Sequence, residues 1–164
     1  MKDQQILRTR AEQLAAPPET PSSEPTQVVV VVQAGQERYA LPAHQISMVR
    51  ATPPLTRLPG LHPVIVGMIS LQGHVLTVLD LAALLGDVPD GQAGYIVVYR
   101  DSGKQVALRV RNAEEAVDIP LHLPRPAQTR PGLSGVWKAR VTLLDLEPLF
   151  AEFMRITGGD RAVL

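Results

Sequence analysis

The histidines are the residues of this chain whose type is best suited to metal binding. His44, His62, His74 and His122 are scattered, and no two show the i, i+4 spacing that places two ligands on one helix face. None lies beside a carboxylate in a known ligand motif. The spacing therefore indicates histidines in loops and predicts no metal site.

Two aspartates, Asp80 and Asp145, occupy the same place in two similar stretches, residues 77–81 and 142–146. Paired carboxylates perform general acid–base catalysis when both face one cleft and have separated pKa values. Here each aspartate directly precedes a short apolar stretch, the position at which a carboxylate caps the first turn of a helix. The pattern predicts two helix caps rather than a catalytic pair.

The composition removes further classes of chemistry. The chain has no cysteine, so thiolate nucleophiles, disulfides and cysteine zinc sites are excluded. It contains no glycine-rich phosphate loop and no Gly-x-Ser-x-Gly elbow. We therefore expect a protein that is not an enzyme and binds no cofactor. A ligand-binding or enzymatic β-barrel with an unfamiliar site stays as an alternative.

Charge and hydropathy bear on the partners and the location of the protein. The 16 basic residues balance the 16 acidic ones, so no strong field attracts nucleic acid or an anionic membrane. No window approaches the roughly 20 apolar residues that span a bilayer, and the N-terminus lacks the pattern of a secretory signal. We expect a soluble, cytoplasmic protein that neither binds nucleic acid nor inserts into a membrane.

The elements that position these groups begin with a run of five valines at residues 28–32, the strongest strand signal in the chain. An exposed run of this kind would aggregate, so we expect it to be buried on both faces. Ala34-Gly35 interrupts it and residues 38–41 resume the pattern, which predicts a hairpin.

The second half of the chain repeats this plan. Ala40-Leu41 closes the first hairpin, and Ala107-Leu108 closes a similar one 67 residues later. This duplication predicts two similar β-lobes related by pseudo-symmetry, each too small for a full core and therefore sharing an apolar interface. Short strands with Gly and Pro turns favour closed barrels. Further expected elements are a strand at 46–50, a Pro-rich loop at 53–60, strands at 64–71 and 75–79, and a helix at 81–85 closed by Gly86.

The first 26 residues differ in composition and pattern from the rest. Leu7, Ala11 and Leu14 recur at helical spacing, and residues 17–26 form a Pro-rich linker. Two interpretations stay open: a mobile tail, or a helix that docks on the domain or on a partner. The expected organisation is an N-terminal helix or tail with its linker at 1–26, a domain at 27–156 and a C-terminal tail at 157–164.

Several short stretches recur in a characteristic order and spacing: Tyr39-Ala40-Leu41-Pro42, Ile46, Val49-Arg50, residues 56–60, 66–73 and 78–81, and, in the second half, residues 95–108 and 141–146. Together they resemble the CheW family of bacterial chemotaxis coupling proteins. The resemblance covers about residues 27–153 and implies an all-β fold with short helices, built of two pseudo-symmetric five-stranded SH3-like barrels.

The resemblance also implies a function. A CheW-like protein is a non-catalytic adaptor that links the helical tips of chemoreceptors to the regulatory domain of the histidine kinase CheA, at receptor arrays on the membrane. The receptor tip docks in a groove between the lobes, and the kinase domain pairs barrel to barrel. The alternative is a repurposed SH3-like scaffold that serves motility or array structure without kinase control.

Three positions depart from the family pattern. Gln72 stands in place of an arginine in the turn at residues 70–73, and Gln is neutral with a shorter reach. Met48 stands in place of a glutamate, and Arg111 in place of an aspartate. These departures leave the fold prediction intact, while the standard set of partners is less firmly implied.

The predicted binding residues surround the strand at 46–50 and the two hairpin turns. Ile46 and Val49 are expected in the core, and Met48 on the face opposite Ile46, where a more exposed methionine suits an adaptable binding surface. Gly67 and Gly73 indicate turn geometry or close backbone approach. Trp137 is either a core or rim anchor or a binding hot spot. The full predicted protein-binding set is Ile46, Met48, Arg50, Arg57, Leu58, Gln72, Gly73 and Trp137.

Overall fold

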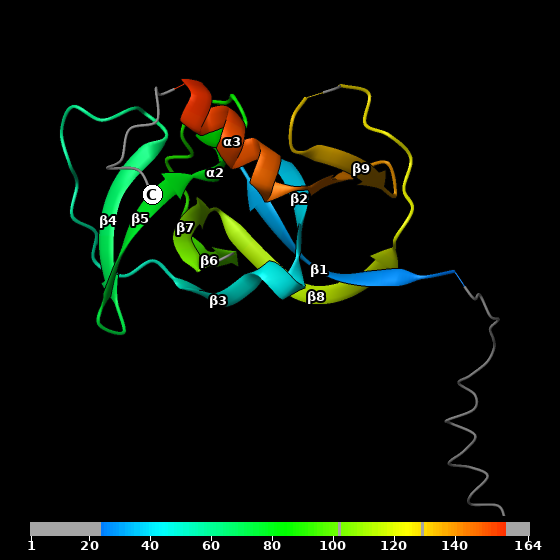
Figure 1. Cartoon of the computed structure of the whole chain (residues 1–164), viewed down its shortest axis with the longest axis horizontal. Coiled ribbons are helices and arrows are strands. Elements are labelled where there is room, and N and C mark those ends of the chain that lie inside the picture. The colour runs from blue at the N-terminus through cyan, green and yellow to red at the C-terminus, as the bar shows by residue number, and fades with distance from the viewer. Residues whose placement is uncertain (1–23, 102, 129, 157–164) are drawn as a thin grey trace, which may run out of the picture.

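The computed structural model describes residues 24–101, 103–128 and 130–156. The helix or tail expected before residue 24 and the tail expected after residue 156 lie outside these ranges. The described chain is built mostly of strands, and Figure 1 shows them gathered in two bodies side by side, with α2 and α3 above the junction.

The described residues form two sets of strands that alternate with short helices. The first half contains β1 (Thr26–Ala34), β2 (Glu37–Pro42), the 3-10 helix η1 (Ala43–Gln45), β3 (Ile46–Ala51), β4 (Ile65–Leu71), β5 (His74–Asp80) and α2 (Leu81–Leu84). The second half contains β6 (Tyr95–Asp101), β7 (Lys104–Val110), β8 (Asn112–Pro120), β9 (Leu133–Trp137), β10 (Val141–Leu144) and α3 (Leu146–Ile156).

The strands form two five-stranded sheets of identical plan. The sheet with the order β8-β1-β2-β10-β9 is called lobe A, and the sheet with the order β3-β6-β7-β5-β4 is called lobe B. In each lobe the second strand of a hairpin pairs in parallel with a strand from the other half of the chain: Ala40 of β2 faces Leu143 of β10, and Ala107 of β7 faces Val78 of β5. The predicted duplication and pseudo-symmetry are therefore confirmed.

The two copies of the repeat exchange strands. β3 follows β2 in sequence but pairs with β6 in lobe B, with Met48 facing Val98. β8 follows β7 but pairs with β1 in lobe A, with Val29 facing Val117. Each lobe therefore takes strands from both halves of the chain, and neither lobe is complete without the other copy.

The described residues form three apolar clusters. One lies within lobe A and includes Val29, Val31 and Ile119, and a second lies within lobe B. The third and largest joins the lobes and receives both helices, which confirms the predicted shared interface. The valines of β1 point alternately to two clusters: Val29 and Val31 pack within lobe A, and Val32 packs between the lobes. Val28 is exposed, so the prediction of burial on both faces was wrong at this first valine.

A β-bulge in β3 decides where its side chains point. Ile46 faces Tyr99 and Met48 faces Val98, so Ser47 is an extra residue between two successive partners. Regular alternation would place Ile46 and Met48 on one face, but the bulge sends Ile46 to the inter-lobe cluster and Met48 to the interior of lobe B. Val49 is 39% exposed, so the prediction that it lies in the core was wrong.

Candidate protein-binding surfaces

Seven of the eight predicted binding residues lie in three neighbouring segments of lobe B. Ile46, Met48 and Arg50 lie on strand β3. Arg57 and Leu58 lie in the loop that follows it, and Gln72 and Gly73 form the β4–β5 turn. Trp137 ends β9 in lobe A, on the opposite side of the molecule in Figure 1. The structure therefore divides the predicted set between two surfaces.

The loop after β3 is fixed where it crosses β4. The Thr56 N–H donates to the Met68 carbonyl at 2.9 Å, and the Met68 N–H donates to the Thr56 carbonyl at 2.8 Å. A Cβ at Gly67 would lie 2.2 Å from the Thr56 oxygen, so only glycine fits under the crossing. This confirms the predicted close backbone approach and holds the next residues, Arg57 and Leu58, on the exposed outer side.

The β4–β5 turn presents its two central residues to solvent. Gln72 has φ 52° and Gly73 has φ 81°, the two left-handed residues of a type I′ hairpin turn. This confirms the predicted turn geometry at Gly73. Val75, just beyond the turn, is 64% exposed, and sequence reasoning placed it in a strand without selecting it as a surface residue.

The exposed apolar and cationic residues of lobe B differ from those expected. Met48 is half-buried against the lobe B interior, so the expectation of a more exposed methionine was wrong. Val49, the next residue along the strand, points to the other face and is exposed, and Leu58 is also exposed. Arg50 and Arg57 point to solvent from the same strand and loop. Apolar side chains beside arginines are suited to a protein partner.

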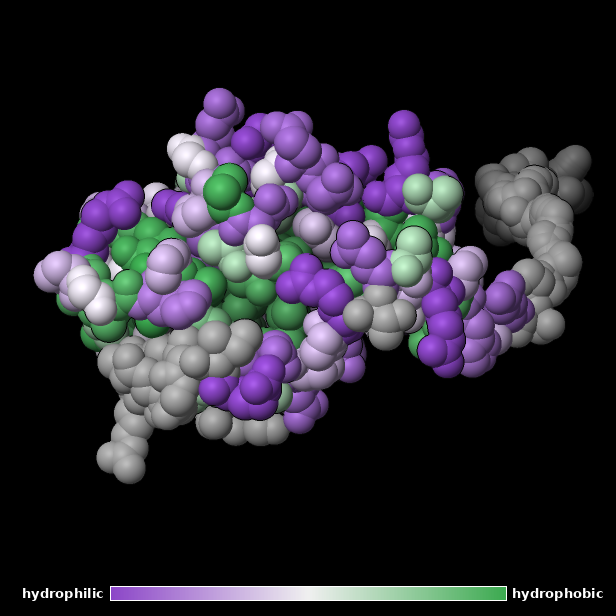
Figure 2. Space-filling model, turned by 90° about the horizontal axis from the view of Figure 1, so that it is seen from above, coloured by the Kyte–Doolittle hydropathy of each residue, from purple (hydrophilic) through white to green (hydrophobic). Residues whose placement is uncertain are grey.

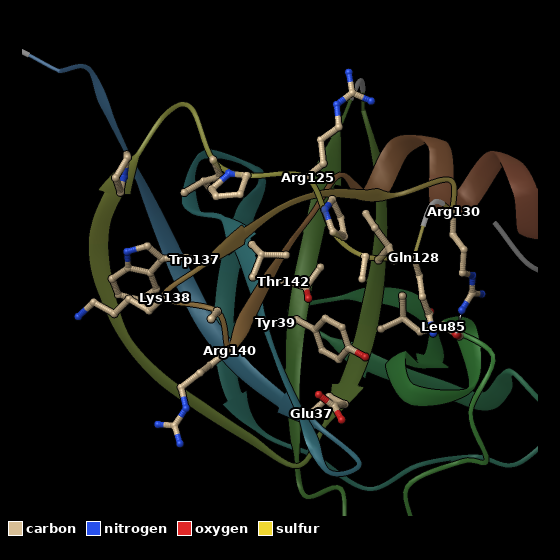
Figure 3. A pocket seen from close by; sticks show the side chains of 18 of the residues that line it. Glu37, Tyr39, Leu85, Arg125, Gln128, Arg130, Trp137, Lys138, Arg140 and Thr142 are labelled. Carbon is tan, nitrogen blue, oxygen red and sulfur yellow. Dashed lines mark hydrogen bonds between the residues drawn. The ribbon is translucent and has the colours of Figure 1, made fainter.

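Lobe A carries a hollow of about 1180 Å³ between its sheet and the segment that joins β8 to β9. Tyr39 and Thr142 point into it from β2 and β10, and Trp137 lies at one end (Figure 3). The Lys138 ammonium lies 4.6 Å from the Trp137 ring centroid, a cation–π contact. Trp137 also packs against the lobe A cluster, so it is a rim anchor that lines a hollow.

The far wall of the hollow is tied to α2. The Arg130 guanidinium donates to the Leu85 carbonyl at 2.6 Å, just after the last turn of that helix. Burial raises the pKa of the Tyr39 phenol, and the carboxylates of Glu37 and Asp87 raise it further. The phenol therefore stays neutral near pH 7.

Asp80 confirms its predicted role as a helix cap, and it has a second role. Its carboxylate accepts a hydrogen bond from the Ala83 N–H at 3.0 Å, which caps α2. The same fully buried carboxylate accepts two hydrogen bonds from Arg109, at 3.1 and 2.7 Å. Asp145 directly precedes α3 but is exposed. Sequence reasoning missed Arg109 because its partner lies on a strand 29 residues away.

A second buried aspartate connects the lobes. Asp90 receives two hydrogen bonds from Arg111, at 3.0 and 2.8 Å, and one from the Gly35 N–H at 2.9 Å. The hydrogen bond from Arg111 is the main cause that lowers the pKa of Asp90 from 3.8 to about 2. Gly35 lies in the β1–β2 turn, so the pair clamps that turn to the segment before β6. Arg111, which stands in place of an aspartate of the family pattern, therefore has its ionic partner within the chain.

The described residues contain no group of three or more His, Asp or Glu side chains placed to hold a metal ion. None of the helices in the described ranges is long and apolar enough to cross a membrane. On the face shown in Figure 2, apolar side chains gather over lobe B and the middle of the molecule, and hydrophilic ones predominate over lobe A.

Two interlocked five-stranded barrels that bury Asp80 and Asp90 in ion pairs define a duplicated β-barrel domain. The chain belongs to the CheW-like domain family, whose model matches residues 28–154. It is 25% identical over 135 residues to a probable chemotaxis protein CheW from Rhizobium etli, a match that covers 76% of this chain and 87% of that protein.

A solved structure supports the same fold. The crystal structure of the scaffolding protein CheW from Thermoanaerobacter tengcongensis matches with a TM-score of 0.67 and 22% sequence identity, over 77% of this chain and 93% of that one. Together with the two five-stranded sheets, this likeness confirms the predicted fold class of paired SH3-like barrels.

Proposed function

We propose that this protein is a non-catalytic adaptor of a bacterial chemosensory array, in which it links the helical tips of chemoreceptors to the regulatory domain of a CheA-type histidine kinase. The observation that carries the proposal is the family match over residues 28–154. The names of its relatives, a chemotaxis protein and a scaffolding protein, support the same role. The proposed setting is the cytoplasm, with recruitment to receptor arrays.

The proposed mechanism uses the rigidity of the double barrel. The shared apolar cluster and the Asp90–Arg111 pair hold the lobes in one orientation, so a partner bound by one lobe is fixed relative to a partner bound by the other. Exposed Val49 and Leu58 offer apolar area to a receptor helix, and Arg50 and Arg57 steer an acidic tip toward it. We propose residues 27–156 as the binding domain and residues 1–26 and 157–164 as its flanking segments.

A second candidate function rests on the β4–β5 turn. Gln72 is exposed at its tip, where typical family members have an arginine, so a charged contact from this position is absent. A scaffold that binds receptors or copies of itself without kinase control fits this change. Gly73 keeps the turn geometry in both cases, so the two functions differ in the chemistry of one side chain.

Calorimetry with the regulatory domain of the CheA-type kinase from the same organism tests the adaptor role. We expect a dissociation constant in the micromolar range or tighter, a free energy of about −8 kcal/mol or better. Gln72→Arg, at an exposed position, should strengthen binding if the lost charge matters. No binding by the folded protein or by Gln72→Arg would reject kinase coupling and favour the second function.

The receptor surface is tested separately with a peptide hairpin that copies a receptor tip. Val49→Glu and Leu58→Glu each place a carboxylate at an exposed apolar position of lobe B, and both should weaken binding at least tenfold, about 1.4 kcal/mol. Val88→Glu is the matched control, because Val88 is also an exposed valine but lies in the segment after α2. Equal binding by all three variants would remove β3 and its loop from the interface.

A further inference from the structure

The lobe A hollow has a counterpart in lobe B that is filled. The repeat relates Leu85 to Phe150 and Val88 to Phe153, since both pairs keep the 65-residue offset of Asp80 and Asp145. Phe150 and Phe153 are buried in the inter-lobe cluster. The Phe153 ring meets the His62 ring edge-on at 5.3 Å, so α3 packs against the loop that follows β3.

The difference arises from the length of the two helices. α3 has 11 residues, which carries Phe153 over lobe B. α2 has four, ends at Leu84, and Gly86 with φ 94° turns the chain away. Val88 is therefore 77% exposed instead of covering lobe A. The place that an apolar helix face fills in lobe B is open in lobe A, where Tyr39 and Leu133 are only partly buried.

The part of the chain that the structure describes begins at the edge of this hollow. Glu24 is one of the residues that line it, and the Leu121 N–H donates to the Pro25 carbonyl at 2.9 Å where the wall of the hollow starts. The 23 residues before Glu24 include Leu7, Ala11 and Leu14 at helical spacing. About ten residues separate Leu14 from Glu24, and an extended Pro-rich linker of that length reaches about 30 Å, enough to return across the hollow.

We propose that residues 1–23 fold back on their own domain and place the apolar face of Leu7, Ala11 and Leu14 in the lobe A hollow, where they do for lobe A what α3 does for lobe B. Tyr39, Leu133 and Trp137 form the apolar contacts that the hollow offers to this face. This proposal concerns lobe A and does not depend on the partners proposed above for lobe B.

Trp137 is the only tryptophan, so its fluorescence reports directly on the hollow. The full chain is compared with Leu7→Asp/Leu14→Asp by acrylamide quenching and by the emission maximum. We expect the double variant to show a larger quenching constant and an emission maximum at longer wavelength, because water reaches the indole. Gln5→Asp/Gln13→Asp adds the same charge on the other face of the segment, and should match the unchanged chain.

Three outcomes would overturn the proposal. Identical quenching in the unchanged chain and the leucine variant would mean that the segment does not cover Trp137. Equal effects of the leucine and glutamine variants would assign the change to charge. Protection that increases with protein concentration would assign the hollow to a second copy. A nitroxide on Gln13→Cys, the only thiol in that variant, adds a second measurement: it should broaden the amide signal of Thr142 but not that of Gln72, and no broadening at Thr142 would also reject docking.

Discussion

Lobe A and lobe B close their barrels in the same way and differ in what then covers them. In each, the segment after the edge strand crosses the next strand at a glycine: Thr56 lies over Gly67 in lobe B, and Leu123 lies over Gly135 in lobe A. The backbone bond from the Val136 N–H to the Pro124 carbonyl corresponds to the bonds between Thr56 and Met68. The framework has been kept in both copies.

The difference begins after the last strand of each copy. The longer α3 buries Phe150 and Phe153 against lobe B, while the shorter α2 leaves Val88 in solvent and a hollow in lobe A. A change in helix length of about two turns therefore gives two barrels of identical strand order different surfaces.

The largest difference in stability between the lobes is expected when the corresponding side chains Phe153 and Val88 are truncated. Phe153→Ala leaves a cavity in the inter-lobe cluster and should lower the free energy of unfolding by about 3–5 kcal/mol. Val88→Ala, at the exposed counterpart, should change it by less than about 0.5 kcal/mol. Urea unfolding measures both. Similar losses would mean that α3 does not support lobe B in the way described.

The two aspartates that precede α2 and α3 give the next comparison. Asp80→Ala removes a buried carboxylate that caps α2 and pairs with Arg109, and we expect a loss of about 3–5 kcal/mol because the guanidinium is left without its partner. Asp145→Ala, at the exposed counterpart, should cost less than about 0.5 kcal/mol, because the third residue of α3 is Pro148, which has no N–H to donate to the carboxylate. Thermal unfolding of both variants tests this order, and a larger loss at Asp145 would reverse it.

The glycine crossings should differ by a smaller amount. A Cβ at Gly67 meets the Thr56 carbonyl oxygen at 2.2 Å, whereas one at Gly135 meets the Leu123 Cβ at 2.8 Å. Gly67→Ala must therefore displace backbone and should cost about 1–3 kcal/mol, and Gly135→Ala should cost less because a side chain moves. Chemical unfolding of the two variants measures the free energy of unfolding of each. Equal losses would show that the two crossings accommodate an added Cβ equally well.

The Asp90–Arg111 pair that connects the lobes should make the stability of the protein depend on pH. Because the pKa of Asp90 is lowered from 3.8 to about 2, its contribution to stability is complete above about pH 4 and is lost as the pH falls toward 2. Asp90→Asn should therefore be less stable than the unchanged chain at pH 5, and the difference should shrink between pH 4 and 2. Asp118→Asn, an exposed carboxyl on β8, controls for charge. A constant difference across this range would show that Asp90 does not titrate as described.

Much of the fold was readable from the sequence because its signals are local. The valine run, the turn glycines and the recurring Ala-Leu pairs predicted the hairpins, the repeat and the shared interface. β8 was not predicted, since it lies at an edge and only Ile119 of the described strand is fully buried, which leaves weak alternation.

The candidate site was less predictable because it depends on register and on distant pairs. Met48 and Val49 have the reverse of their expected exposure, because alternation along β3 turns Met48 inward and Val49 outward. The bulge at Ser47, which sends Ile46 and Met48 to different clusters, has no signal in residues 46–50. Arg109 and Arg111 find their aspartates 29 and 21 residues away, through a strand order that composition does not reveal. The hollow in lobe A follows from the length of α2, where Gly86 was the available signal.

The exchange of β3 and β8 has a consequence for how such a chain can have arisen. A polypeptide with only one copy of the repeat would hold two strands of one barrel and three of the other, and would find the missing ones in a second identical molecule. Two such molecules would form a symmetric, domain-swapped dimer with the same ten strands in the same order. Joining the two copies head to tail turns an association that depends on concentration into one that does not, and it frees each copy to change without the other.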